Sequence, residues 1–342
     1  MRIYNNIDQN QLGNWQMGPF KRPSGINPII SPNKESIFEC PIRKQKIYWE
    51  TLHTFNPAAV VKDNKVILLY RAEDDTGKKR LGGHTSRLGV AESYDGLHFK
   101  RKTTPIFYPE HDSQRLFEWE GGCEDPRIIE AEDGTYFLTY TQWNRRTARL
   151  AIASSKDLIH WKKYGSIFED TNNEWKNRWT KAGAILCELN DGRLKATKIN
   201  GKYWMYFGEL KIWLASSLDL IRWKLEKLVL SPRQNNFDDA LVEVGPPAIL
   251  TEKGILLLYN AKNKEERYYS AGQALFDKKD PTHIIARTEN AFFKPEEPYE
   301  LTGQYTAGTV FIEGLVYFKE KWFLYYGCAD SHVAVAVCEP NK

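Results

Sequence analysis

The residues best suited to acid–base chemistry lie in one short segment, residues 120–127, with the sequence EGGCEDPR. Three carboxylates and an arginine lie there beside two glycines and a proline, directly before an apolar run. Pro126 has no backbone N–H to donate, so we expect it to mark the start of a strand and not its middle. The glycines allow the backbone to approach a ligand closely. Taken alone, the segment is equally typical of a surface turn with a local Asp–Arg pair.

An internal repeat provides the structural context of this segment. Similar phrases recur around Ser93, Ser154 and Ser216, at intervals of about sixty residues, with weaker copies near the C-terminus. A turn and a short strand pattern rich in aromatic and β-branched residues precede each copy, which is typical of hairpins. Five such units predict an all-β fold, specifically a five-bladed β-propeller. We expect a single catalytic domain over residues 1–342, with residues 1–25 as an N-terminal extension.

Composition narrows the classes of function. The net charge of +4 is not concentrated in a basic run, and no stretch of about eighteen apolar residues is present, so neither nucleic acid nor a membrane is an expected partner. The N-terminal residues do not resemble a signal peptide, which favours the cytoplasm unless a leader was removed. The five cysteines have no CxxC spacing and the histidines no HExxH spacing. We therefore expect free thiols, no cofactor and no catalytic metal.

In a propeller, the innermost strands converge on a central channel, so polar residues near their starts are candidates for the site. Those residues are Asn56, Asp125, Lys198 and Glu243. A second set follows the aromatic strands and includes Arg71, Asp75, Glu209 and Asp330. Any one of them is most simply a solvated turn residue, but their recurrence in each unit favours a polar central pocket.

The chain resembles glycoside hydrolase family 130, the β-mannoside phosphorylases and hydrolases. The motifs that carry the resemblance are FNPA at 55–58, YRAEDD at 70–75, SRLG at 86–89, CEDPR at 123–127, KINGK at 198–202, GPP at 245–247 and YYGCAD at 325–330. The resemblance implies an inverting mechanism in which Asp125 protonates the leaving oxygen through the 3-hydroxyl of the mannosyl unit. It places Asn56, Arg71, Asp75, Arg87 and Asp330 at the mannosyl subsite. We add Glu124, Arg127 and Lys198 as substrate-binding candidates.

The chain departs from the phosphorylase pattern where phosphate should bind. Phosphorylases of the family have an Arg-Lys pair before Ile-Asn-Gly, whereas this chain has Thr197-Lys198. Glu209 and Glu243 stand where phosphorylases tend to carry cationic segments. Two carboxylates beside a phosphate dianion cost several kcal/mol in a partly desolvated site, and the same carboxylates can deprotonate water. We therefore predict hydrolysis of β-mannosides, with β-1,2-linked manno-oligosaccharides as the expected substrate and Glu209 and Glu243 as candidate bases.

Other interpretations remain open at this level. Glu209 or Glu243 could be structural, paired with Lys198, Lys211 or Arg127. A phosphorylase would hold phosphate with Lys198, Arg127, Arg145 and Lys262. An arabinosidase- or xylosidase-type propeller and a non-catalytic carbohydrate-binding propeller are the remaining alternatives. The linkage depends on loops such as residues 110–115 and 169–180, and the sequence does not predict the oligomeric state.

Overall fold

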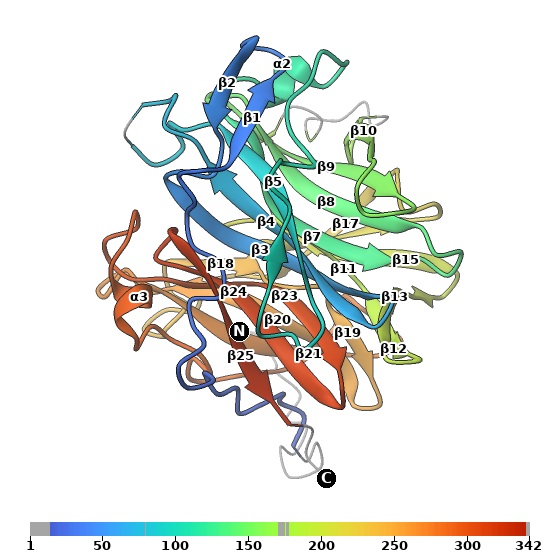
Figure 1. Ribbon diagram of the computed structural model, residues 1–342. Coiled ribbons are helices and arrows are strands. Elements are labelled where there is room, and N and C mark those ends of the chain that lie inside the picture. Colours follow the sequence, from blue (N-terminus) through green and yellow to red (C-terminus); the bar gives the residue numbers. More distant parts are fainter. Residues whose placement is uncertain (1–13, 79, 170–174, 176–177, 340–342) are drawn as a thin grey trace.

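The structure, a computed structural model, describes residues 14–78, 80–169, 175 and 178–339. This part of the chain is built almost entirely from strands (Figure 1), with two four-residue helices, α2 (Arg115–Glu118) and α3 (Pro298–Leu301). No helix in it is long and apolar enough to cross a membrane. The prediction of an all-β fold is confirmed.

Within the described residues, most strands form five antiparallel groups that follow one another along the chain. The first contains β3 (His53–Lys62), β4 (Lys65–Glu73), β5 (Ser86–Ser93) and β6 (Lys100–Arg101). The second contains β7 (Gly122–Glu130), β8 (Tyr136–Trp143), β9 (Ala148–Ser155) and β10 (Lys162–Ser166). The third contains β11 (Gly183–Ile185), β14 (Lys198–Ile199), β15 (Lys202–Phe207), β16 (Ile212–Ser217) and β17 (Lys224–Leu230).

The last two groups are built in the same way. The fourth contains β18 (Leu241–Val244), β19 (Ile249–Thr251), β20 (Gly254–Lys262), β21 (Tyr269–Phe276) and β22 (Ile284–Arg287). The fifth contains β23 (Val310–Phe318), β24 (Lys321–Cys328) and β25 (His332–Cys338). Two hairpins lie outside the groups, β1 (Ile37–Cys40) with β2 (Gln45–Tyr48), and β12 (Cys187–Asn190) with β13 (Arg193–Ala196).

A buried tyrosine recurs in the central strand of each group, which supports the five-unit repeat read from the sequence. The five are Tyr70 in β4, Tyr140 in β8, Tyr206 in β15, Tyr259 in β20 and Tyr325 in β24. Each side chain is fully buried, and its hydroxyl donates a hydrogen bond to a carboxylate or a backbone carbonyl. Such pairing allows a large aromatic ring with a polar end to be placed in a core.

Parallel bridges link separate groups, and the two ends of the described chain meet. Ser86 of β5 pairs with Gly122 of β7, while the β12–β13 hairpin pairs through β13 with β7 and through β12 with β19. Near the N-terminus, Lys21 forms an antiparallel bridge with Val337 of β25. The N-terminal segment therefore adds to the edge of the fifth group, and Phe20 of the expected extension is buried in the main hydrophobic cluster.

A bulge interrupts the first strand of the first, second and fifth groups, and at each bulge one polar residue lies out of register. Pro126 lies within β7, so the expectation that it marks the start of a strand is wrong. The register of β7 shifts between Glu124 and Arg127, and at such a bulge the missing N–H of Pro126 removes no ladder hydrogen bond. Asp125, at the bulge, has a left-handed backbone with φ of 48°.

The same local structure appears in two other groups. In β3 the register shifts around Asn56, whose φ is 47°, and Pro57 again follows the bulged residue. In β23 the shift falls at Glu313. An Asn or Asp tolerates the left-handed region better than most residues, so the Asn-Pro and Asp-Pro pairs suit this geometry. The bulges place Asn56, Asp125 and Glu313 at matching positions of three groups.

Candidate active site

One cavity of about 340 Å³ collects most of the predicted site residues. Its lining comes from all five groups and consists of Phe55, Asn56, Arg71, Leu81, Gly82, Glu124, Asp125, Trp143, Ala148, Trp179, Lys181, Glu209, Glu243, Tyr269, Gln304, Tyr305, Phe311 and Asp330. The predicted residues that meet here are Asn56, Arg71, Glu124, Asp125, Glu209, Glu243 and Asp330. Residues separated by up to about two hundred and seventy positions in the sequence therefore share one polar, concave site, as a substrate pocket requires.

Asp125 is held by two cations and an amide. Its Oδ1 accepts hydrogen bonds of 2.9 Å from Asn56 Nδ2 and 2.9 Å from Arg71 Nη1, and its Oδ2 lies 3.1 Å from Lys181 Nζ. Burial alone would raise the pKa of Asp125, but the charges of Lys181 and Arg71 outweigh it and hold this pKa below its usual range. Asp125 is therefore ionised in the free site.

Glu124 is the neighbour that retains a proton. Its Oε1 accepts a 2.9 Å hydrogen bond from Arg71 Nη2, and its Oε2 lies 3.9 Å from Lys181 Nζ. Burial raises the pKa of Glu124 to about 7, although Arg71 and Lys181 oppose the rise. Because Glu124 and Asp125 share both cations, they titrate as a pair, and this pair keeps one proton up to near-neutral pH.

The two candidate bases are not neutralised by ion pairs. Within the described residues, no hydrogen bond or ion pair reaches the carboxylate of Glu243, which is buried and lines the cavity. Burial, and then the charge of Glu209, raise the pKa of Glu243 to about 8. Glu209 Oε2 accepts a 2.9 Å hydrogen bond from the indole Nε1 of Trp179. Neither carboxylate forms the ion pair with Lys198, Lys211 or Arg127 that a purely structural role would need.

Lys181 is the central cation of the site, and the sequence analysis missed it. Lys181 lies just before β11, and its ammonium group faces Glu124 and Asp125. The charges of Glu209 and Glu243 also act on it. Lys198 was expected in this role, but it is exposed on β14, with its ammonium 4.7 Å from the ring centre of Tyr203. The sequence signal that could have identified Lys181 is its position just before the first strand of the third group.

Arg127 supports the site from behind and does not line the cavity. Its Nε and Nη2 each donate a 2.7 Å hydrogen bond, to the backbone oxygens of Gly245 and Val244 respectively. Its Nη2 also lies 3.1 Å from Oε1 of Glu313, a buried carboxylate that the sequence analysis did not identify. Arg127 thereby fixes the backbone that carries Glu243.

Asp75 and Arg87 also lie away from the cavity lining. Asp75 is exposed in the turn after β4. Its neighbour Asp74 is buried and pairs with the guanidinium of Arg87, which points toward Cys40. The pair therefore braces the first group, because a buried guanidinium must be matched by a carboxylate nearby.

The C-terminal part of the chain closes the cavity with Gln304, which was not predicted, and with the predicted Asp330. Gln304 Nε2 donates a 3.1 Å hydrogen bond to Oε2 of Glu73, whose Oε1 binds Arg71. Asp330, in a left-handed turn with φ of 51°, faces the same region, and burial raises its pKa to about 7. Loop sequences that follow short helices have no periodicity, which explains why Gln304 was missed.

A possible metal-ligand cluster lies beside the cavity. His53, Glu73 and His84 each offer one ligand atom, and these atoms lie within 4.8 Å of one another. Both oxygens of Glu73 are already hydrogen-bonded, to Arg71 and Gln304. The arrangement fits a hydrogen-bonded support for Arg71 better than a metal centre.

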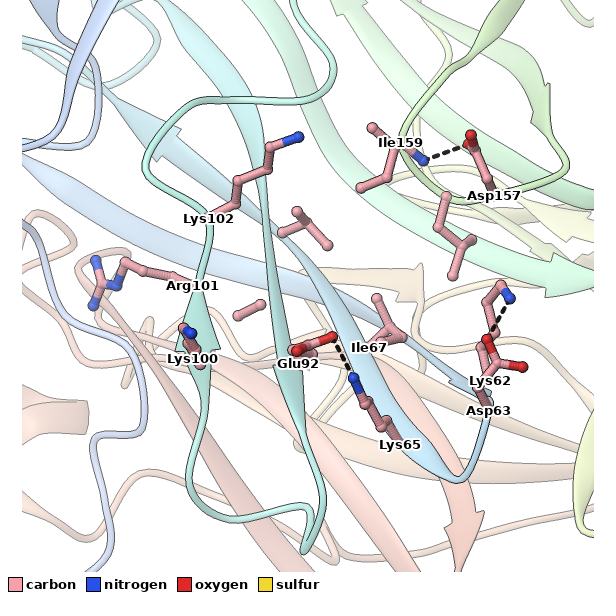
Figure 2. A pocket seen from close by; sticks show the side chains of 13 residues that line it. Lys62, Asp63, Lys65, Ile67, Glu92, Lys100, Arg101, Lys102, Asp157 and Ile159 are labelled. Atoms are coloured by element: carbon pink, nitrogen blue, oxygen red, sulfur yellow. Dashed lines mark hydrogen bonds and ion pairs between the residues drawn. The ribbon is translucent and has the colours of Figure 1, made fainter.

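A second hollow, of about 430 Å³, lies on the first and second groups and contains none of the predicted residues (Figure 2). Four of its charged side chains pair with one another, and Lys65 Nζ lies 3.0 Å from Glu92 Oε2 in one of these pairs. Lys62 and Asp63 form a further pair at 2.6 Å. The first cavity remains the candidate active site because its carboxylates and cations converge on one space.

Comparison with known proteins identifies the family of this chain. Residues 20–342 match the glycoside hydrolase family 130 profile, described as β-1,4-mannooligosaccharide phosphorylase. One solved structure, from work on hydrolases of this family that target β-1,2-mannosidic linkages in Candida mannan, is 50% identical. It superimposes with a TM-score of 0.94 over 96% of each chain.

Two further relatives represent both activities of the family. A glycosyl hydrolase from Bacteroides ovatus is 50% identical, with a TM-score of 0.93 over 96% of each chain. A 1,2-β-oligomannan phosphorylase from Thermoanaerobacter sp. (strain X514) is 34% identical over 316 residues, or 91% of this chain and 95% of the relative. With the family's CEDPR and FNPA motifs placed at the bulges that line a polar cavity, the chain belongs to glycoside hydrolase family 130.

Proposed function

We propose that this protein is an inverting glycoside hydrolase that cleaves β-mannosides, with β-1,2-linked manno-oligosaccharides as its substrates. We further propose that its five antiparallel groups are the blades of a five-bladed β-propeller and that the cavity lies at their centre. The recurrence of the buried tyrosine in five central strands, and a cavity lining drawn from all five groups, support this arrangement. The relatives at 50% identity that are described as hydrolases support the reaction.

The observation that carries the proposal is the pair of unneutralised carboxylates, Glu209 and Glu243, on the cavity wall. Phosphorolysis would place a dianion beside the charge of Glu209, and beside that of Glu243 once it ionises near pH 8; a like charge within about 5 Å is strongly unfavourable in a partly desolvated site. Water carries no charge, and either carboxylate is suited to accept its proton. The raised pKa of Glu243, about 8, makes it a strong base once it is ionised.

The acid function belongs to the Glu124–Asp125 pair. In the free site Asp125 is ionised and Glu124 holds the proton. Binding of the mannosyl unit brings its 3-hydroxyl to Asp125, and the proton of the pair passes through Asp125 and this hydroxyl to the leaving oxygen. The activated water attacks the opposite face of the anomeric carbon, so the configuration inverts. Asn56 and Arg71 fix the Asp125 carboxylate in place for the transfer.

Phosphorolysis is the second candidate, because the Thermoanaerobacter relative is a phosphorylase and because Lys181 and Arg71 supply two cations. Product analysis with β-1,2-mannobiose separates the two reactions. We expect free mannose in buffers with and without inorganic phosphate, at the same rate. Phosphate-dependent turnover that yields mannose 1-phosphate would overturn the hydrolase proposal. In that case Lys181 would be reassigned as a phosphate ligand.

A further inference from the structure

Trp179 makes a contact with Glu209 that the reaction scheme above does not use. Its indole Nε1 lies 2.9 Å from Oε2 of Glu209, and its side chain is 51% exposed on the cavity wall. Within the described residues, no other hydrogen bond reaches the carboxylate of Glu209. Trp179 also lines an adjoining hollow of about 360 Å³, which shares Lys181 and Glu209 with the cavity.

The backbone around this contact is fixed. The N–H of Gly208 donates to the carbonyl oxygens of Lys181 and Ala182, at 3.1 and 3.0 Å, and so ties the segment carrying Trp179 to the loop carrying Glu209. Gly208 has φ of 122°, and a Cβ there would lie 2.4 Å from the backbone oxygen of Lys211. Only glycine fits at this position without a shift. The Trp179–Glu209 contact is therefore built into the junction of β15 with the next loop.

The donor is neutral, and this matters for a base. The charged and titratable groups that face Glu209 are Lys181 before β11, Glu243 on β18 and Tyr269 on β21. A cation in hydrogen-bond contact would neutralise the carboxylate. An indole N–H orients one oxygen and leaves the charge in place. The other oxygen, Oε1, keeps its lone pairs for a proton from water.

We propose that Trp179 is a positioning residue for hydrolysis, holding Oε2 of Glu209 so that Oε1 faces the attacking water. The inference rests on the proposed function. In the step concerned, a proton moves from water to Oε1 of Glu209 while the water oxygen forms the bond to the anomeric carbon. The bond to the leaving oxygen breaks, and that oxygen takes the proton of the acid pair. Trp179 exchanges no proton; it sets the direction of one lone pair.

Trp179→Phe tests this role because it removes the N–H and keeps an aromatic ring on the wall. We expect kcat on β-1,2-mannobiose to fall about tenfold, with KM within about twofold of the parent value. Trp213→Phe is the matched control. Trp213 lines only the adjoining hollow, so kcat and KM of this variant should stay near the parental values.

A double-mutant cycle separates this inference from the proposed function. If Trp179 acts through Glu209, Trp179→Phe should slow the Glu209→Gln variant no further. A parental kcat in Trp179→Phe would overturn the positioning role, as would full additivity with Glu209→Gln. If Glu209→Gln itself hydrolyses at the parental rate, the assignment of Glu209 as a base is wrong. An inactive Glu209→Gln beside an unaffected Trp179→Phe refutes the role of Trp179 alone.

Discussion

Replacing Glu243 by glutamine should make the protein more stable at alkaline pH while it removes a catalytic base. The carboxylate is 3% exposed and lies near the charge of Glu209, and together these raise its pKa from 4.5 to about 8. A group whose folded-state pKa is raised favours the folded state fully below its unfolded pKa. That contribution is lost as pH rises from about 4.5 toward about 8. At pH 8 the ionised Glu243 therefore lowers the stability of the parent, and the glutamine variant has no such loss.

The size of the effect follows from the pKa shift of Glu243. A rise from 4.5 to about 8 corresponds to about 5 kcal/mol at most, at about 1.4 kcal/mol for each pH unit. Lys181 and solvent in the cavity reduce the free-energy cost of the buried charge. We therefore expect the glutamine variant to be about 2–3 kcal/mol more stable than the parent at pH 8. For a chain of 342 residues, this free energy raises the melting temperature by about 3–5 °C. At pH 5 the parent carboxyl is neutral like the amide, and the two melting temperatures should coincide.

Thermal melts at pH 5 and pH 8 give the melting temperatures of the parent and of Glu243→Gln. Hydrolysis assays at the same two pH values check the loss of activity. Glu252→Gln, in an exposed turn, is the control and should show no pH-dependent change. Equal stability of Glu243→Gln and the parent at pH 8 would refute the reasoning. So would a stabilisation that is as large at pH 5 as at pH 8, because its cause could not then be the charge of Glu243.

Three further outcomes follow from the charges in the cavity. Asp125→Asn keeps the shape of the acid, so circular dichroism should show an intact fold while turnover of unactivated mannosides falls at least about a hundredfold. Lys181→Met leaves Asp125 without one of its two cations and should lower stability by about 3 kcal/mol in denaturant titrations, whereas Lys198→Met, at an exposed position, should change it little. The kcat/KM of the parent should rise with pH as Glu243 ionises, toward about pH 8. On the residual activity of Glu209→Gln this rise should occur at lower pH, because the like charge that raises the pKa of Glu243 is gone.

Features that depend on a few neighbouring residues could be predicted from the sequence. The Asn-Pro and Asp-Pro pairs marked the positions where β3 and β7 aim Asn56 and Asp125 into the cavity, because a bulge with a left-handed residue is encoded locally. These local pairs did not predict that β7 continues through Pro126, because that depends on how β8 pairs with β7 on both sides of the bulge.

Other site residues depend on tertiary arrangement and could not be predicted. Glu73, Asp74 and Asp75 follow one another, and only the packing of Arg87 shows that Asp74 turns inward while Asp75 stays in solvent. Lys181 precedes β11, a strand of three residues without a recognisable periodicity, and was passed over for Lys198. The choice between two lysines depends on which strand of the third group faces the cavity, and no local pattern carries that information.

The balance of charge in the cavity explains why water is the favoured nucleophile. Two cations, Arg71 and Lys181, both engage the acid pair of Glu124 and Asp125, so neither is free to receive a further anion. The opposite part of the lining contributes Glu209 and Glu243, which have no cationic partner in contact within the described residues. A phosphate would have to compete with Asp125 for Lys181 while it approached the charge of Glu209 and, near pH 8 and above, that of Glu243. Each like-charge contact is worth on the order of 1 kcal/mol or more at an effective dielectric near 20. Hydrolysis needs no such cation, because the proton of a neutral water passes to a carboxylate that burial has already made more basic.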